Sequence, residues 1–289
     1  MPIKESRILF LLAAINFTHI LDFMIMMPLG NYLIPSFGLS ASQFTILVSA
    51  YAFSAGISSF LAAFYANKYD RKQILIRGYL GFLLGTLACG LAPSYEWLLL
   101  ARVTAGVFGG LLAAQVISII ADLIPFERRG KAMGRVMAAF AVSSTLGVPF
   151  ALYLANLISW HAPFILVAVL GLALLPFLHK DLPSMTGHLT QQDPPSSTQV
   201  IKQVFANVNQ RRALLFSGLM FMGHFMIIPF INPFLEFNKG FDKQHTPLVY
   251  LFGGICAFFA ANIIGALSDK YGKWRTYIIC LLLSLPLVV

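Results

Sequence analysis

The chain has 289 residues, of which 58% are hydrophobic and 11% are charged. A soluble domain carries about a quarter charged residues, so this composition excludes an ordinary soluble protein. The net charge of +9 would suit nucleic acid, but the charges lie mainly in short segments between apolar stretches. The 3 cysteines lie inside apolar segments without ligand spacing, which favours packing roles over a disulfide or metal set.

Apolar blocks long enough to cross a bilayer recur along the whole chain. They predict an all-α membrane protein with about eight or nine transmembrane helices. A ninth helix begins near residue 274 and has about 16 residues, fewer than the roughly 20 needed to span, so we expect the chain to stop inside an element. No cleavable signal peptide is evident, because the first apolar stretch is too long. The expected spans are 8–29, 43–66, 73–92, 96–124, 132–157, 162–179, 211–235 and 247–268.

Positive charge is distributed unequally between the two sides of this predicted membrane protein. Every Lys and Arg except Arg102, Lys239 and Lys243 falls on one side when the spans alternate in direction. The positive-inside rule makes that side the cytoplasm and places the N-terminus there. The same asymmetry explains the net charge without any nucleic-acid partner. We expect a monomeric, multi-pass protein of the plasma (inner) membrane, embedded in the lipid bilayer.

Residues 181–210 form the only long polar stretch. It contains Pro183, Pro194 and Pro195 among Ser, Thr and Gln, which predicts a flexible cytoplasmic linker. The linker separates a six-helix unit, 1–180, from a partial second unit, 211–289, that holds two helices and the start of a third.

The first apolar segment contains Asn16, His19 and Asp22. A spacing of three places them within about a third of the helix circumference. A carboxylate inside a membrane is costly, so Asp22 should face a cavity or a partner, where it is a candidate for proton exchange. The alternative is a paired Asp22 that only locks the first helix to the fourth. His19 fits a proton relay or a neutral hydrogen-bonded histidine equally well.

Arg102 stands near the start of the fourth segment and is followed by small residues. Its guanidinium needs an acceptor, and Asp22 or a backbone carbonyl could serve. The alternative is an interface anchor whose side chain extends outward to water. Gln115, deeper in the same segment, and Asn16 are candidates for lining a substrate cavity.

A short basic loop occurs twice, at an offset of 269 − 67 = 202 residues. Self-similarity between apolar helices indicates an internally duplicated membrane transporter. A glycine such as Gly272 permits a tight turn at positive φ, and an aspartate near a helix end can cap backbone donors. In the first copy Asp70 stands at the position of this glycine, and we expect it to supply the carboxylate that Asn67 lacks. The candidate gating residues of both copies are Asn67, Asp70, Arg71, Lys72, Asp269, Lys270, Gly272, Lys273 and Arg275.

A third basic loop follows the fourth span. Arg128 and Arg129 can pair there with Asp122, Asp70 or Glu127. Pairs that break and form again as two bundles rock would weight one conformation against another. Simple solvated charge is the alternative.

Small residues recur at every fourth position of the fifth and eighth spans. Such stripes let helix backbones approach closely in lipid, so we expect these two helices to pack against each other across the two bundles. The residues expected at this contact are Gly147, Pro149, Gly253, Ala257, Ala261 and Gly265.

The seventh span contains His224, Asn232 and two prolines, Pro229 and Pro233. Broken helices tend to line substrate paths, so His224 and Asn232 are candidates for substrate contact.

Several of these motifs resemble the major facilitator superfamily. Residues 265–275, Gly-Ala-Leu-Ser-Asp-Lys-Tyr-Gly-Lys-Trp-Arg, resemble its signature loop between helices 2 and 3, which recurs in weaker form between helices 8 and 9. Arg102 with its small neighbours resembles the helix 4 motif, and 125–130 resembles the loop after that helix. Asp22, shortly before Pro28, resembles the drug:proton antiporters of this superfamily. The Gly147-Val-Pro149 segment is a looser form of their exporter motif and is similar to sugar-efflux relatives.

This resemblance implies the major facilitator fold, with a complete six-helix N-terminal bundle and an incomplete C-terminal bundle. It implies a secondary transporter that exports a small organic solute (a drug, sugar or metabolite) in exchange for protons by alternating access. In that interpretation Asp22, His19 and Arg102 serve proton coupling. The alternatives are a proton-coupled or facilitative importer and a truncated, non-transporting membrane protein. We expect no enzyme activity, cofactor or metal, because the sequence has no Walker loop, metal-ligand spacing or nucleophile motif.

Overall fold

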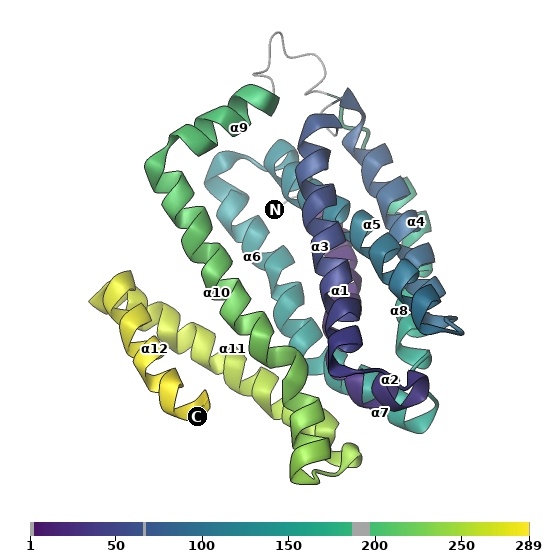
Figure 1. Cartoon of the computed structure of the whole chain (residues 1–289). Coiled ribbons are helices and arrows are strands. Elements are labelled where there is room, and N and C mark those ends of the chain that lie inside the picture. Colours follow the sequence, from purple (N-terminus) through teal and green to yellow (C-terminus); the bar gives the residue numbers. More distant parts are fainter. Residues whose placement is uncertain (1–2, 66–67, 187–196, 289) are drawn as a thin grey trace.

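The computed structural model describes residues 3–65, 68–186 and 197–288, and every regular element within these ranges is a helix. Seven helical stretches of the described residues are long and apolar enough to cross a membrane, which confirms the all-α membrane fold. The first six of them form one bundle (Figure 1). Its elements are α1 (Ile3–Ile25), α2 (Gly30–Phe37), α3 (Ala41–Tyr65), α4 (Arg71–Gly90), α5 (Tyr95–Leu123), α6 (Phe126–Val142), η2 (Ser143–Gly147), α7 (Val148–Leu157) and α8 (Ala162–Asp181).

The fifth span is one long helical stretch that contains a π-helical turn. Its parts α6, η2 and α7 run without a break from Phe126 to Leu157, and it therefore begins six residues before the expected position 132. Pro149 lies two residues after the π-helical turn, inside this continuous stretch, where it has no backbone N–H to donate. A π-helical turn just before a proline is an ordinary way to absorb the lost hydrogen bond.

The helix α2 was not predicted. The chain ends α1 at Ile25 and turns into this eight-residue helix, which closes with Gly38 at φ 61°. Gly30 lets α2 pack closely on α3, because an added Cβ there would lie 2.7 Å from the ring of Phe44. The α2 helix therefore covers one end of the bundle.

Close backbone contacts hold the first bundle together. A Cβ added to Gly85 of α4 would lie 2.7 Å from the backbone nitrogen of Ala105 in α5. A Cβ added to Gly106 of α5 would lie 2.9 Å from the Cα atom of Tyr51 in α3. Gly85 therefore brings α4 close to α5, and Gly106 brings α3 close to α5, as small residues do in membrane helices.

The prediction that the whole of 181–210 is an unstructured linker was wrong at its second half. Residues Ser197–Ala206 form a helix, α9, and Asn207 caps the start of the next helix by accepting hydrogen bonds from two backbone amides. The turn signals of the two adjacent prolines, Pro194 and Pro195, lie before this helix and do not extend into it.

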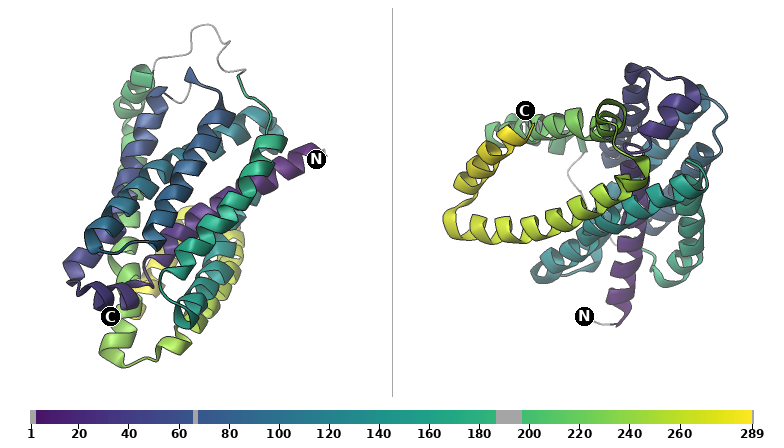
Figure 2. Two further views of the ribbon diagram at one scale, coloured as in Figure 1. Left: turned by 90° about the vertical axis from the view of Figure 1, so that its right-hand side faces the viewer. Right: turned by 90° about the horizontal axis from the view of Figure 1, so that it is seen from below.

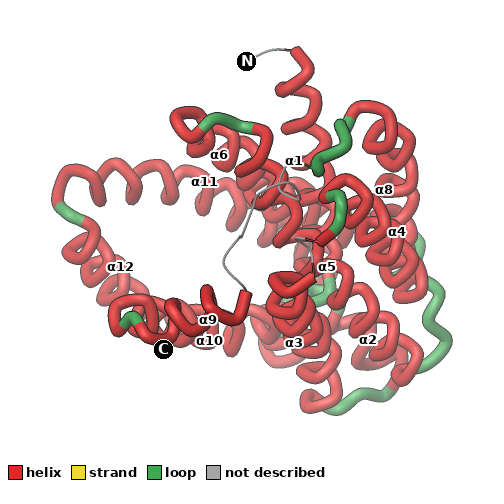
Figure 3. Tube along the Cα trace, turned by 90° about the horizontal axis from the view of Figure 1, so that it is seen from above, coloured by secondary structure: helices red, strands yellow, loops and turns green. Residues whose placement is uncertain are grey.

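The second part of the chain packs against the first mainly at one end, where α10 and α11 contact α2, η2 and α7, while α9 also contacts α3. In Figure 1, α10 and α11 approach the first bundle beside α2 and α7 and diverge from it toward the end where α9 lies. Seen from below and from above, α10, α11 and α12 form an open arc on one side of the first bundle (Figures 2 and 3). The elements are α10 (Val208–Pro233), η4 (Phe234–Asn238), η5 (Lys243–His245), α11 (Thr246–Tyr271) and α12 (Lys273–Val288).

The predicted contact between the fifth and eighth spans is confirmed, but its register was wrong. The α11 helix packs against η2 and α7, and a Cβ added to Gly254 would lie 2.5 Å from the Cα atom of Thr145. Gly253 and Ala257 are exposed, so the contact face of α11 is displaced by one residue. The side chains of Ala261 and Gly265 lie outside the described residues. Gly147 instead faces α1, where an added Cβ would lie 2.9 Å from Leu21.

Candidate functional site

The polar centre of the first bundle is an ion pair between Asp22 of α1 and Arg102 of α5. The Nη1 atom of Arg102 lies 2.8 Å from Oδ2 of Asp22, and both side chains are 0% exposed. The same nitrogen lies 3.4 Å from the backbone carbonyl of Asp22. Arg102 therefore does not extend outward to water, and of the two positions considered for it, the inner one is correct.

Aromatic and small residues enclose this pair. The guanidinium of Arg102 lies over the ring of Tyr51, 4.4 Å from its centroid, in a cation–π contact. Thr86 and Cys89 of α4 lie beside the two charges. The pair therefore contacts α1, α3, α4 and α5 at once, and a single polar contact joins four helices of the bundle.

The pair leaves hydrogen-bonding capacity unused. Within the described part of the chain, Oδ1 of Asp22 and the Nε and Nη2 atoms of Arg102 have no hydrogen-bond partner. Burying such groups costs free energy, and a buried ion pair is seldom the most stable solution for a core. Its presence in the middle of an apolar bundle therefore calls for a functional explanation.

His19 lies near the pair but does not bond to it. Its ring centroid lies 6.2 Å from that of Tyr51 and 5.7 Å from that of Phe82. Gly109 provides the space, because an added Cβ would lie 3.0 Å from the His19 imidazole. The Nδ1 atom has no partner among the described residues, so His19 is placed for a proton-transfer role only if a mobile group or water links it to Asp22.

Two of the predicted cavity residues, Asn16 and Gln115, are buried among the helices of the first bundle. Asn16 donates from Nδ2 to the carbonyl of Val136 in α6 at 3.2 Å, so it connects α1 to α6. Gln115 is buried within α5, and its Oε1 atom has no partner in the described chain.

A cavity of about 310 Å³ does lie between the two bundles, lined by other residues. The α1 and α3 helices contribute one side of it and α10 contributes the other. None of the described residues that line it is charged. Phe23, which follows Asp22 in the chain, lines this cavity and lies 5.5 Å from Tyr51, ring centroid to ring centroid. Two aromatic rings therefore connect the cavity to the Asp22–Arg102 pair.

The residues of the cavity wall carry apolar groups and two hydroxyls. Those hydroxyls, on Thr45 and Ser49, donate to carbonyls of their own helix. The lining residues are Phe23, Thr45, Val48, Ser49, Ala52, Gly218, Phe221, Met222, Pro229 and Phe230.

Asn232 closes one end of the interface instead of facing a substrate path. Its Nδ2 atom donates to the carbonyl of Pro28 at 2.9 Å, and its side chain is buried. The side chain of His224, the other predicted substrate residue of this helix, lies outside the described residues. The proline-broken end of α10 therefore positions an amide against the end of α1.

A second group of contacts closes the same end of the molecule. The Nζ atom of Lys243 lies 3.4 Å from the carbonyl of Asn31 and 5.3 Å from the ring centroid of Tyr32. The carbonyl of Lys243 accepts from Nδ2 of Asn156 at 3.4 Å, and the Tyr32 hydroxyl bonds to Oδ1 of the same amide. One residue of the second part of the chain therefore contacts both α2 and α7 of the first.

Sequence reasoning missed this closure and the carboxylate beside it. Glu236 is 9% exposed and accepts a 2.7 Å hydrogen bond from the hydroxyl of Thr246. An isolated carboxylate at the end of an apolar stretch was the available signal, but the expected span ended one residue earlier, at 235. Tyr51 carried no signal of its own, since nothing in its spacing separates it from core tyrosines.

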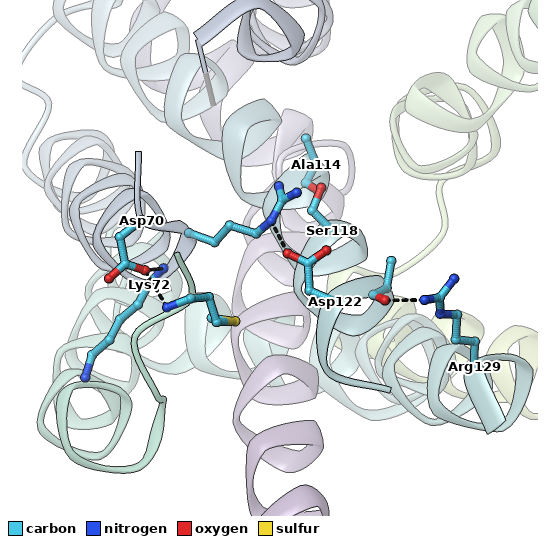
Figure 4. Close-up of polar contacts among 9 residues, drawn as sticks. Asp70, Lys72, Ala114, Ser118, Asp122 and Arg129 are labelled. Carbon is cyan, nitrogen blue, oxygen red and sulfur yellow. Dashed lines mark hydrogen bonds and ion pairs between the residues drawn. The ribbon is translucent and has the colours of Figure 1, made fainter. Parts of the chain in front are cut away.

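The opposite end of the first bundle carries the basic loops. Arg71 forms an ion pair and hydrogen bond with Asp122, which joins the start of α4 to the end of α5 (Figure 4). Arg129 donates to the carbonyls of Ala121 and Ile124 at 2.5 and 2.9 Å. These charges therefore close the exposed end of α5, where carbonyls lack helical partners.

Two further basic residues of this end, Lys72 and Arg128, have partners within the first bundle as well. Arg128 makes two hydrogen bonds to Glu5, at 3.0 and 3.1 Å. Lys72 donates from Nζ to the carbonyl of His179 at 2.7 Å. Arg128 therefore pairs with Glu5, not with any of the three carboxylates considered for it.

Asp70 binds backbone and hydroxyl groups instead of cations. Its carboxylate caps α4 at the amide of Lys72 and accepts from the amide of Met185, both at 2.9 Å (Figure 4). It also accepts a 2.5 Å hydrogen bond from the hydroxyl of Ser184. Partial burial opposes ionisation, but these hydrogen bonds outweigh it and hold the pKa of Asp70 below its usual range. The first basic loop is thereby attached to the start of the linker.

The second copy of the loop turns through its glycine as predicted. Gly272 adopts φ 92°, between α11 and α12, and Lys270 lies 5.2 Å from the ring centroid of Tyr271. Arg275 is exposed. Asn67 and the side chains of Asp269 and Lys273 lie outside the described residues. The two copies therefore differ in their turns, because Asp70 caps a helix at φ −59° where Gly272 needs a left-handed conformation.

Comparison with known proteins identifies the class. The model of the Major Facilitator Superfamily matches residues 12–289, so the chain belongs to this family of membrane transporters, which are not enzymes. It is 27% identical over 265 residues to the uncharacterized MFS-type transporter YceJ of Bacillus subtilis, covering 91% of this chain and 67% of YceJ. It is 35% identical over 113 residues to multidrug resistance protein 3 of the same organism, covering 39% of this chain and 22% of that protein.

Solved structures confirm the fold. A bacterial homolog of the human lysosomal transporter Spinster, in an inward-facing and unoccupied conformation, superposes with a TM-score of 0.75 at 21% identity, covering 94% of this chain and 64% of that one. The inward open xylose transporter XylE of E. coli gives a TM-score of 0.56 at 18% identity, covering 73% and 54%. The chain thus spans about 57% to 67% of the length of the first two curated relatives.

The ion pair of Asp22 with Arg102 should dominate the stability of the first bundle. Asp22→Asn or Arg102→Gln should each cost about 3–5 kcal/mol, because each leaves its buried partner uncompensated. The double variant should cost less than the sum, which thermal or denaturant unfolding of the purified protein would measure.

The matched control is the pair of Glu5 and Arg128, whose side chains are 20% and 41% exposed. Glu5→Gln and Arg128→Gln should each cost about 1 kcal/mol or less, because solvent screens the pair. Equal costs for the two pairs would contradict a dominant role for the buried one.

Asp70 should contribute stability in a pH-dependent way. Because native contacts lower its pKa, its contribution is complete above the ordinary value of about 3.9 and is lost as pH falls through the lower folded-state value. Asp70→Ala should therefore lower stability by about 0.5–2 kcal/mol at neutral pH, as loss of a helix cap does. The difference between the two proteins should shrink in strong acid; a difference independent of pH would refute the assignment.

Proposed function

We propose that the chain is the greater part of a proton-coupled exporter of small organic solutes that works by alternating access. The observation that carries the proposal is the buried Asp22–Arg102 pair behind the cavity between the bundles. A carboxylate held inside the membrane is a costly feature that transporters use for proton relays. The single carboxylate of this pair can bind one proton and release it again.

The proposed cycle uses the contacts around the pair. When Asp22 binds a proton it loses its charge, and the attraction that holds Arg102 to α1 is weakened. The guanidinium then depends more on its contact with Tyr51. Because Tyr51 adjoins Phe23 at the cavity wall, a shift of Arg102 is transmitted to the solute cavity. Proton binding and solute binding are coupled in this way without direct contact between them.

The described conformation corresponds to one end state of this cycle. The contacts of Asn232 and Lys243 close the interface at the α2 end, while the bundles diverge at the α9 end. We place the basic loops and the α9 end in the cytoplasm by the positive-inside rule, with the N-terminus cytoplasmic and the protein in the plasma membrane. The conformation is then inward-facing, as in the two solved relatives.

Export is the favoured direction for two reasons. Multidrug resistance protein 3, which shares 35% identity over 113 residues, is named for resistance to drugs, a property that export of those drugs would produce. The described residues of the cavity wall carry no charge, which suits solutes that reach the site from a membrane or the cytoplasm as largely apolar molecules. The close contact of Gly254 in α11 with η2 is a suitable pivot for rocking of the bundles.

Proton-dependent transport tests the proposal. In inside-out vesicles an imposed proton gradient should drive uptake of members of a panel of fluorescent lipophilic dyes. Asp22→Asn should reduce the uptake to the level of vesicles without the protein, because the amide that replaces the Asp22 carboxylate cannot bind and release a proton.

Glu5→Gln is the matched control, since it removes a carboxylate of the same helix that is paired but partly exposed. It should leave uptake unchanged. Full activity of Asp22→Asn, or uptake that is independent of the gradient, would refute the coupling. Gradient-driven uptake in right-side-out vesicles alone would establish an importer instead.

A further inference from the structure

A groove of about 430 Å³ runs along the surface of the first bundle between α1 and α8. Its walls are apolar and come from Phe10 and Leu11 of α1 and from Leu174 and Phe177 of α8. Phe10 and Phe177 are 71% and 56% exposed. In a membrane protein such side chains face the hydrocarbon of the bilayer. The groove is therefore open to lipid along its length.

The mouth of the groove carries two opposite charges. Arg7 and Asp181 both line it, yet neither forms an ion pair with the other or with another described residue. The candidate spans that contain them run Glu5–Ile25 and Ala162–Asp181. The two charges therefore lie at the ends of their spans, at the depth where lipid headgroups meet water.

We propose that this groove binds one phospholipid of the bilayer with a zwitterionic ethanolamine headgroup. The lipid phosphate pairs with Arg7, the ammonium group donates hydrogen bonds to Asp181, and an acyl chain lies against Leu11 and Leu174. This occupant satisfies both charges at once. A glycerol headgroup would offer Asp181 only neutral hydroxyl donors, which bind a carboxylate less strongly than an ammonium group does, and a choline headgroup has no N–H to donate.

The position of the groove also favours a lipid over a soluble solute. Exposed rings on both walls would remain in contact with hydrocarbon if a small polar solute occupied the mouth. Glu5, the other carboxylate near this end of α1, is occupied by Arg128. The two charged residues of the lipid site are therefore ones that no other described ion pair requires, and the site lies apart from the Asp22–Arg102 pair.

Lipid retention by the purified chain tests the proposal. Native mass spectrometry would compare phosphatidylethanolamine, phosphatidylglycerol and phosphatidylcholine with the same acyl chains. Wild type should retain the ethanolamine lipid in preference to the other two. Arg7→Gln should lower retention of all three by about two- to fivefold, the size expected of an exposed charge contact.

Asp181→Asn should lower retention of the ethanolamine lipid by a similar factor, leave the glycerol lipid unchanged and so abolish the preference. Lys180→Gln is the matched control, because it removes an adjacent exposed charge outside the groove lining. It should change nothing.

A second variant tests the groove itself. Leu174→Trp fills the apolar part while both charges remain, and it should lower retention of all three lipids together. Equal retention of the three lipids by wild type, a preference for the glycerol lipid, or a preference that survives Asp181→Asn would each overturn the proposal.

Discussion

The ion pair of Asp22 and Arg102 is the constraint on which the first bundle depends. Two opposite charges in an apolar interior are stable only while they stay together, and here they join α1 to α5 with Tyr51 stacked against the guanidinium. The glycines that follow Arg102 let α3 approach closely enough to supply that ring. The packing of this region and the chemistry proposed for it therefore rest on the same two residues.

A pair of this kind is held together while both groups are charged and is weakened when its carboxylate binds a proton. A transporter that couples protons to solute movement needs such a change. The weak point of the pair is the carboxylate, since a single proton removes the charge that Arg102 requires. The contacts that close the interface elsewhere are of another type. Asn232 and Lys243 bond to backbone carbonyls with single hydrogen bonds, each of which is worth little on its own. Such contacts can separate readily when the central pair changes, whereas the close helix contact at Gly254 can persist as a pivot.

The sequence predicted the parts of the molecule that depend on the length of apolar blocks and on the free-energy cost of burying a charge. Long apolar blocks predicted the bounds of the spans to within about six residues. The unfavourable free energy of burying Asp22 indicated that this carboxylate needed a partner. The pairing with Arg102 was foreseen as one of two possibilities, which only packing could separate. The register of α11 was wrong by one position, because Gly253 and Gly254 are adjacent and either can begin a small-residue stripe. The α2 and α9 helices and the role of Asn232 depend on tertiary contacts that no local pattern records.

The most direct test of proton coupling through Asp22 is a distance measurement across the α9 end of the molecule. Spin labels at Tyr69→Cys and Trp274→Cys, both exposed positions, would report the separation of the bundles by pulsed electron resonance, with Cys256 and Cys280 replaced by serine. We expect the distance distribution to shift between mildly acidic and mildly alkaline buffer, and Asp22→Asn to abolish the shift. A shift that persists in Asp22→Asn would contradict the claim that this carboxylate links protons to bundle movement.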